Sequence, residues 1–268
     1  MPATWAQLEE TAARIQAAER AAGNERMWGF VWQGRAYEGL TCDALEWIAS
    51  QGGGTILDRD GRVTVDNPAA VAALERAAGW VGTISPPGIL NYAEEEARGV
   101  FQSGHAVFMR NWPYAWALAQ GDESPIRGLV GVAALPAGGD GTSTAALGGW
   151  QLAVSRYSAH PEAAVDLALF LTGAAEQKRR AIAGAFNPTI PALYEDAEVL
   201  AANPFFGDLY ETFLTATPRP SSKAGTRYNE LSFEFYSAVF SVLSGQRGAE
   251  DALADLQVRL ETLLSRAR

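Results

Sequence analysis

Hydrophobic residues recur at intervals of three and four along much of the chain, a pattern typical of helices that bury one face. In the first such stretch, Leu8, Ala12 and Ile15 fall on one face. Thr4 stands where a capping side chain is needed, and Gly23 follows as a stop signal. The pattern therefore predicts a helix between these two residues.

The same reasoning predicts many further helices and a few short strands. Helices are expected at 41–50, from 68 onward after the capping Asn67, and at 93–102, 113–119, 161–171, 174–182, 191–200, 204–214, 228–243 and 249–264. Short apolar runs predict buried strands at 27–32, 106–109, 129–135 and 147–154. Because strands alternate with helices, we expect an α/β protein that is rich in helix.

Length and charge narrow the possible classes of protein. A chain of 268 residues is long enough for one large domain or two lobes. Its net charge of -10 disfavours nucleic acid as a partner. Cys42 is the only cysteine, which rules out an internal disulfide and a multi-cysteine zinc site. No run approaches a transmembrane span, and Met1–Ala3 leads into an amphipathic segment without a signal peptide.

A search for catalytic motifs leaves one enzyme class open. The sequence has no GxSxG elbow, no phosphate-binding loop and no HExxH pair, and His105 and His160 lack partners for a metal. No metal or other cofactor is implied. Glycoside hydrolysis needs only two suitably spaced carboxylates, and Glu38 lies in an aromatic segment beside Tyr37. A carbohydrate-active enzyme therefore remains an alternative.

Aromatic residues cluster with polar residues and glycine in a way that suits sugar binding. The chain has eight tryptophans, and mixed clusters occur at 28–39, 110–116, 147–151, 219–220 and 227–230. Aromatic rings can cover the apolar face of a sugar, while arginine, carboxylate and amide groups bind its hydroxyls. Glycine lets backbone groups approach a ligand. These segments together indicate a sugar-binding site.

The tryptophans divide into two predicted groups. Trp5, Trp47 and Trp80 lie on apolar helix faces, which favours the core. Trp112 follows the predicted strand at 106–109 and stands beside proline, and Trp150 stands beside glycine in the predicted strand at 147–154; both settings favour a position facing the ligand.

Four segments, at 36–42, 109–114, 145–150 and 227–232, resemble extracellular solute-binding proteins of family 1. The branch that they resemble most is that of the trehalose- and maltose-binding proteins of ABC importers. The resemblance implies a type II periplasmic-binding-protein-like architecture, in which two lobes enclose a sugar. It also implies an ABC permease as the membrane partner and a periplasmic or extracytoplasmic location, with the native protein lipid-anchored or secreted.

The resemblance also implies which residues bind the sugar. Trp112 and Trp150 would line the cleft, together with the backbone of Gly148. Either Arg219 or Arg227 would bind sugar hydroxyls, and the sequence leaves that choice open. The further candidates are Tyr37, Glu38 and Tyr114.

Set against the family, the chain is expected to hold an incomplete first lobe. Residues 1–135 and 192–268 would form the second lobe, and 136–191 would be a remnant of the first. Such a remnant exposes strand edges and apolar faces, so its partner would be the missing N-terminal segment or a second copy. The expected function is capture of an α-glucosyl disaccharide such as trehalose or maltose. A lobe retained as a protein-interaction module is the other alternative.

Overall fold

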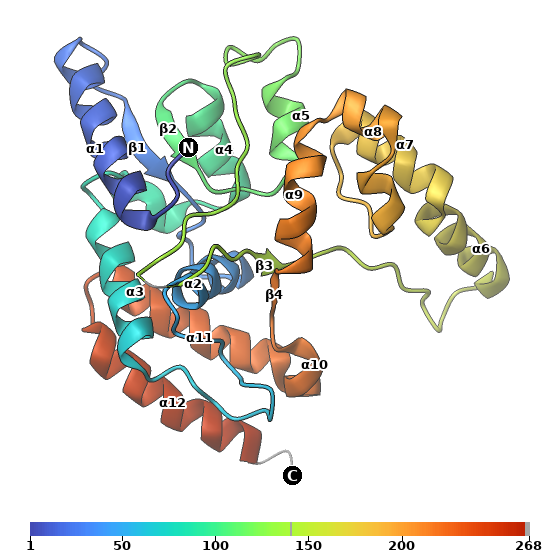
Figure 1. Cartoon of the computed structure of the whole chain (residues 1–268). Helices are drawn as coiled ribbons and strands as arrows, with labels where there is room; N and C mark the ends of the chain where they lie inside the picture. The colour runs from blue at the N-terminus through green and yellow to red at the C-terminus, as the bar shows by residue number, and fades with distance from the viewer. Residues whose placement is uncertain (140, 266–268) are drawn as a thin grey trace. The chain divides into compact units, whose positions relative to one another are not determined.

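The computed structural model describes residues 1–139 and 141–265, which form two compact units (Figure 1). Unit 1 comprises Met1–Asn111, Ala134–Leu147 and Thr215–Arg268, and unit 2 comprises Trp112–Ala133 and Gly148–Leu214. Helices dominate both units, and the strands are short. The expectation of a helix-rich α/β protein is therefore confirmed, whereas the lobe boundaries at 135 and 192 stay a prediction.

Unit 1 contains two short parallel strand pairs. Strand β1 (Trp28–Val31) pairs with β2 (Ala106–Met109), and Phe30 lies opposite Phe108. Strand β3 (Ala146–Leu147) pairs with β4 (Thr217–Pro218). Both pairs join segments that are far apart in sequence, so they require the helical connections between them.

Helices cover these strands. They are α1 (Trp5–Ala21), α2 (Glu38–Ser50), α3 (Pro68–Trp80), η1 (Pro87–Asn91), α4 (Glu94–Gln102), α10 (Ser221–Ala224), η3 (Gly225–Arg227), α11 (Tyr228–Leu243) and α12 (Ala249–Ser265). Helix α11 packs against α2, α3 and α12 (Figure 1). The predicted caps are confirmed, since Thr4 Oγ1 accepts from Gln7 N at 3.2 Å and Asn67 Oδ1 from Ala70 N at 2.9 Å.

The core of unit 1 is built around tryptophan. Trp5, Trp47 and Trp80 are at most 3% exposed, as predicted, and Trp32 joins them at 0%. The ring of Trp47 lies edge-on to Trp32 at 5.0 Å and to Trp80 at 5.4 Å. The buried Trp5 indole donates to Ser50 Oγ at 2.9 Å, so its polar atom is satisfied inside the core.

Unit 2 is helical and has its own smaller core. It comprises α5 (Ala115–Ala119), α6 (Pro161–Thr172), α7 (Ala174–Gly184), η2 (Pro191–Tyr194), α8 (Ala197–Ala202) and α9 (Phe205–Leu214). The core contains Ala181, Ala185, Tyr194, Val199, Phe205, Phe206 and Leu209. Trp116 packs on Phe205 with ring centroids 5.3 Å apart.

Three predicted elements differ in the structure. The expected strand at 129–135 is irregular, and of the one at 147–154 only Leu147 is in strand, where it pairs with β4. Strands require a hydrogen-bonding neighbour, and the described residues supply none for the remainder of either segment. The expected helix at 191–200 is divided at Asp196, whose carboxylate caps α8 by accepting from Glu198 N and Val199 N.

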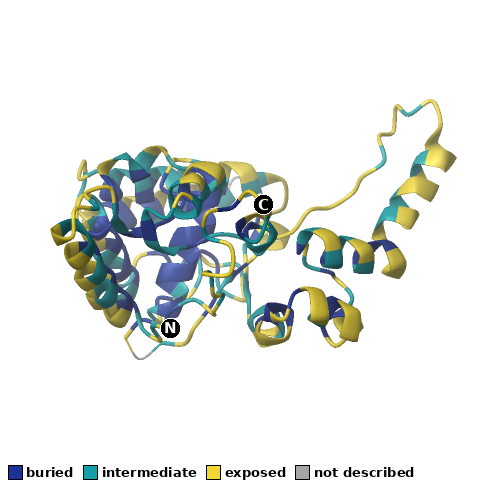
Figure 2. Cartoon of the chain, turned by 90° about the horizontal axis from the view of Figure 1, so that it is seen from above, coloured by how far each residue is buried: buried dark blue, intermediate teal, exposed yellow. Residues whose placement is uncertain are grey.

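Helix α6 is apolar, yet none of its residues is buried. Leu167, Leu169 and Phe170 are between 57% and 65% exposed. In Figure 2 the helix carries only the colours of exposed and intermediate residues. An apolar surface of this kind marks an interaction surface more often than a solvated face.

Candidate functional site

Glu38 gathers three hydrogen-bond donors from distant parts of unit 1. Its carboxylate accepts from Arg219 Nη1, Tyr228 OH and Ser232 Oγ. These four residues are called the Glu38 cluster below. Thr41 extends it, because its hydroxyl lies 2.7 Å from Ser232 Oγ. A carboxylate, a guanidinium and hydroxyls therefore converge at the start of α2.

Local structure explains the arrangement. Glu38 lies in the first turn of α2, where the helix dipole favours a negative charge. Tyr228 and Ser232 are four residues apart on α11 and so share a face. Arg219 directly follows β4. The sequence analysis missed Tyr228 and Ser232 as site residues, and their i,i+4 spacing was the signal that could have found them.

The Glu38 cluster can still bind a ligand. The side chains of Glu38 and Arg219 are 39% and 23% exposed, so solvent reaches them. Arg219 Nε is buried and has no hydrogen-bond partner among the described residues. Burial, followed by the bond to Glu38, raises the pKa of Tyr228, which keeps its hydroxyl protonated. The cluster thus offers donors and an acceptor of the kind that sugar hydroxyls require.

Tyr37 and Arg227 occupy different settings. Tyr37 OH donates to Glu94 Oε2 at 2.7 Å, and the Arg35 guanidinium lies 4.8 Å from its ring centroid. Burial and the bond to Glu94 raise the pKa of Tyr37 as well. Arg227, the residue before α11, pairs at 2.8 Å with Glu230 in the first turn of that helix. Arg219, and not Arg227, is thus the arginine bonded to Glu38.

The other predicted site residues lie in unit 2. Trp112 and Tyr114 immediately precede α5 and are half-buried. Gly148 and Trp150 lie in the irregular segment before α6. Trp150 is 101% exposed and belongs to neither hydrophobic core, so packing does not account for an aromatic residue there.

A second polar cluster in unit 1 is fully buried and was not predicted. Arg110 donates through Nε and Nη2 to both carboxylate oxygens of Glu46, at 2.9 and 2.6 Å, and through Nη1 to Gln33 Oε1 at 2.8 Å. Asp43 lies 2.9 Å from Arg110 and accepts from Gln33 N at 2.9 Å. These four residues form the Arg110 cluster, each at most 3% exposed.

Protonation in the Arg110 cluster reflects burial of two carboxylates beside one guanidinium. Burial raises the pKa of Asp43 well above 3.8, and Arg110 offsets this only in part. Burial lowers the pKa of Arg110, but Asp43 and Glu46 outweigh that effect and raise it overall, so the guanidinium stays charged. Burial also raises the pKa of the neighbouring Cys42 thiol to about 12, which keeps it protonated and unreactive.

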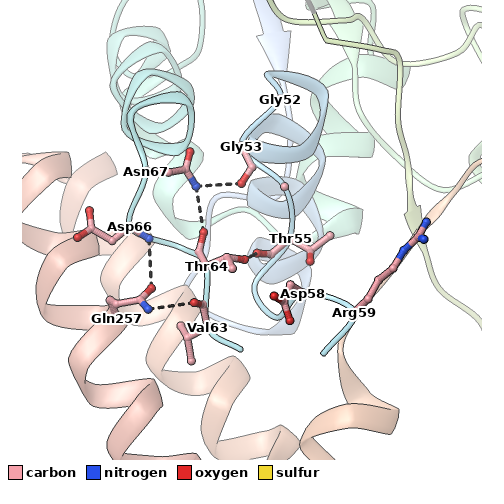
Figure 3. A pocket seen from close by; sticks show the side chains of 11 residues that line it. Gly52, Gly53, Thr55, Asp58, Arg59, Val63, Thr64, Asp66, Asn67 and Gln257 are labelled. Atoms are coloured by element: carbon pink, nitrogen blue, oxygen red, sulfur yellow. Dashed lines mark hydrogen bonds between the residues drawn. The ribbon is translucent and has the colours of Figure 1, made fainter. Parts of the chain in front are cut away.

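A recess of about 830 Å³ opens elsewhere in unit 1 (Figure 3). It is lined by Gly52, Gly53, Gly54, Thr55, Asp58, Arg59, Val63, Thr64, Asp66, Asn67 and Gln257, none of which is a predicted site residue. Its amides bind the local backbone: Asn67 Nδ2 donates to Gly53 O and Thr64 O, and Gln257 Nε2 to Val63 O, each at 3.0 Å. These groups fasten the loop to α3 and α12.

Two further kinds of feature are absent from the described residues. No three His, Cys, Asp or Glu side chains are grouped closely enough there to hold a metal ion. Within the same part of the chain, no helix combines the length and apolarity needed to cross a bilayer.

Comparison with known proteins agrees with these features. Residues 2–178 match the bacterial extracellular solute-binding protein family. The chain is 52% identical to a probable ABC transporter-binding protein of Deinococcus radiodurans over 99% of its own length and 63% of that protein's. These proteins are binding proteins, so the enzyme alternative has no support among them.

Solved structures are similar over nearly the whole chain. Maltose-bound MalE3 of T. maritima has 43% identity and a TM-score of 0.91, covering 98% of this chain and 66% of its own. The GacH receptor of Streptomyces glaucescens, solved unliganded and with acarbose, has 25% identity and a TM-score of 0.81, covering 99% and 65%. The chain thus spans slightly less than two thirds of these relatives. It belongs to the bacterial extracellular solute-binding protein family and has the α/β fold of periplasmic solute-binding proteins.

Proposed function

We propose that the chain is the larger part of the sugar-binding subunit of an ABC importer, and that it helps to bind an α-glucosyl disaccharide such as maltose or trehalose. The observation that carries this is the similarity to maltose-bound MalE3, at 43% identity over 98% of the chain. The protein then works outside the cytoplasmic membrane, in the periplasm or its equivalent, with an ABC permease as its partner.

Within this proposal the Glu38 cluster binds sugar hydroxyls. Arg219 supplies the donors, because it is joined to Glu38 and its side chain is 23% exposed. Arg227 is paired instead with Glu230, three residues later in the chain. Tyr37 lies beside Glu38 and contributes to the same surface of unit 1.

The residues of unit 2 supply the aromatic part of the site. Trp150 stacks on the apolar face of a pyranose, since its ring is fully exposed and free of core packing. Trp112 and Tyr114 contribute further aromatic surface, and Gly148 presents its backbone. Burying one such ring against a sugar removes a large apolar area from water, which favours binding.

We also propose that the second lobe comprises 1–135 and 192–268, with 136–191 belonging to the first lobe. The apolar face of α6 then packs against further first-lobe polypeptide. Two observations support this: Leu169 and Phe170 on α6 are 65% exposed, and the D. radiodurans relative is longer, because the match covers 63% of it.

Thermal unfolding in the presence of maltose, trehalose, sucrose and glucose tests the function. A sugar at 100 times its Kd stabilises the folded state by about 2.7 kcal/mol. We expect one α-glucosyl disaccharide to raise the Tm of the wild-type chain, and the same sugar concentration to raise the Tm of the Arg219→Ala variant by clearly less. If no sugar acts, the test is repeated with the first-lobe segment of the D. radiodurans relative added. Absence of any response there contradicts sugar binding and favours an interaction module.

A further inference from the structure

The Arg110 cluster lies where the chain passes between the two units. The chain leaves unit 1 after Asn111, returns at Ala134, leaves again after Leu147 and returns at Thr215. Arg110 directly precedes the first of these crossings. None of the functions discussed so far uses this buried group of charges.

The cluster is attached to the carboxyl ends of β1 and β2. Arg110 is the residue after β2, and its backbone N donates to Val31 O, the last residue of β1, at 2.9 Å. Gln33 lies two residues beyond β1 and binds Arg110 twice, since its Nε2 also donates to Arg110 O at 3.0 Å. Side chain and backbone of Arg110 are therefore both fixed.

Glu46 extends the cluster to a second crossing. Besides binding Arg110, its Oε1 accepts from Ala146 N, in β3, at 3.0 Å. Ala146 lies two residues before Gly148, just as Arg110 lies two residues before Trp112. The Glu46 carboxylate on α2 thus binds a residue just before each of the two segments that carry the predicted site residues of unit 2.

Strand pairing also connects the Glu46-bound strand β3 to the segment that carries Arg219. Strand β3 pairs with β4, where Thr217 N donates to Ala145 O at 2.8 Å. Arg219 follows two residues later, immediately after β4. The same helix, α2, starts with Glu38, the partner of Arg219.

Charges are an expensive means of filling a core. A buried ion pair can often be replaced by apolar residues without loss of stability, so stability alone does not explain three charged groups here. A two-point bond between a planar guanidinium and a carboxylate does fix distance and orientation closely. Such a fixed geometry is suited to positioning the segments of the chain that leave unit 1.

We propose that Glu46 is a positioning residue for the sugar site. By bonding to Arg110 and to Ala146 N, it fixes the starting points of the segments that bear Trp112, Gly148 and Trp150. Glu46 itself is 2% exposed and does not touch the ligand. The inference rests on the proposed function only where it concerns sugar affinity. The effect of Glu46 on the two segments does not depend on any ligand.

The test compares Glu46→Gln and Glu46→Asp with Glu176→Gln. Glutamine places an NH2 group against a donor, so it cannot keep all three bonds that Glu46 accepts, which are those from Arg110 Nη2 and Ala146 N at Oε1 and the one from Arg110 Nε at Oε2. Aspartate keeps the charge but is shorter by one methylene. Glu176 is a matched control, since it binds Arg179 through both oxygens at 2.8 and 2.6 Å and holds neither crossing.

Amide hydrogen exchange is measured first, without sugar. We expect Glu46→Gln to speed amide exchange about tenfold or more in 111–116 and 146–147, where hydrogen-bonded amides can lose protection, while α12 stays as protected as in the wild type. Glu46→Asp should give a smaller change in the same segments, and Glu176→Gln no change there. Unchanged exchange in those segments, or a loss of protection throughout unit 1 in both Glu46 variants, overturns the proposal.

Sugar affinity is measured second, by calorimetry on the same proteins with the first-lobe segment added where wild type requires it. We expect Glu46→Gln to weaken the Kd about tenfold and Glu46→Asp to lie between that variant and wild type. If wild type binds no sugar, the proposed function fails while the exchange result still stands. Local exchange changes with unaltered affinity overturn the role in sugar binding.

Discussion

Arg219 and Glu38 form an ion pair although they are 181 residues apart in the sequence. The contact joins the end of β4 to the start of α2, and both side chains remain partly accessible to solvent. Exposed ion pairs contribute little to stability, so its value lies in presenting a guanidinium at a fixed place. Arg227, eight residues later, has a local partner instead.

The first prediction separates these two arginines. Arg219→Ala should weaken binding of the preferred disaccharide by about 10- to 100-fold, the cost of losing hydrogen bonds to a charged donor. Arg227→Ala should change the Kd by less than about threefold, because its guanidinium already serves Glu230. Isothermal titration calorimetry measures both, and equal losses in the two variants would argue against the assignment.

The second prediction concerns Trp150. Because its side chain is fully exposed, Trp150→Ala should leave the free energy of unfolding within about 0.5 kcal/mol of wild type. Sugar affinity should nevertheless fall, since the stacking surface is removed. Trp80→Ala is the matched control: it empties a site in the core and should cost about 3–5 kcal/mol in urea unfolding. A large stability loss in Trp150→Ala would mean that the ring packs against protein.

The third prediction follows from Asp43. Burial raises its pKa in the folded state above 3.8, so the folded protein binds this proton more tightly than the unfolded chain does. The associated stability is fully present below pH 3.8 and is lost as pH rises through the folded-state pKa. Asp43→Asn cannot titrate and should lack this decline, which has a limiting slope of about 1.4 kcal/mol per pH unit.

Urea unfolding of wild type and Asp43→Asn between pH 3 and pH 8 measures that difference. Asp58→Asn serves as the control of opposite sign. Hydrogen bonds from the backbone of Arg62 lower the pKa of Asp58, so its stabilising effect is present above 3.8 and is lost as pH falls. Parallel pH profiles for wild type and Asp43→Asn would show that the carboxyl of Asp43 titrates normally.

The fourth prediction concerns the face of α6. Phe170→Gln should alter the free energy of unfolding of the chain by less than about 0.5 kcal/mol, because the ring is 65% exposed. Phe206→Ala, a change in the core of unit 2, should cost about 3–5 kcal/mol.

The same variant shows what covers this face. Phe170→Gln should weaken association of the chain with the first-lobe segment of a relative, as measured by calorimetry. Sedimentation of the chain alone shows whether a second copy covers α6 instead. If Phe170→Gln leaves the association with that segment unchanged, the contact lies elsewhere on the chain.

Local residue patterns were enough to predict most helices, their caps and much of the core, because these depend on neighbours within a few residues. Thr4 and Asn67 cap their helices as predicted, and Trp47 and Trp80 are buried. The motifs were also sufficient to predict the family, which the match over residues 2–178 confirms. Which sugar the chain binds remains a prediction, because selectivity depends on how the hydrogen-bonding groups of the site match the hydroxyls of the sugar.

Contacts between distant segments became visible only in the folded chain. It joined Arg219 rather than Arg227 to Glu38, and it placed Glu46 between Arg110 and Ala146. It also left the predicted strand at 129–135 irregular. The reason is the same in each case: a strand or a buried charge depends on a partner far away in the sequence, and residue patterns record only which partners a segment requires.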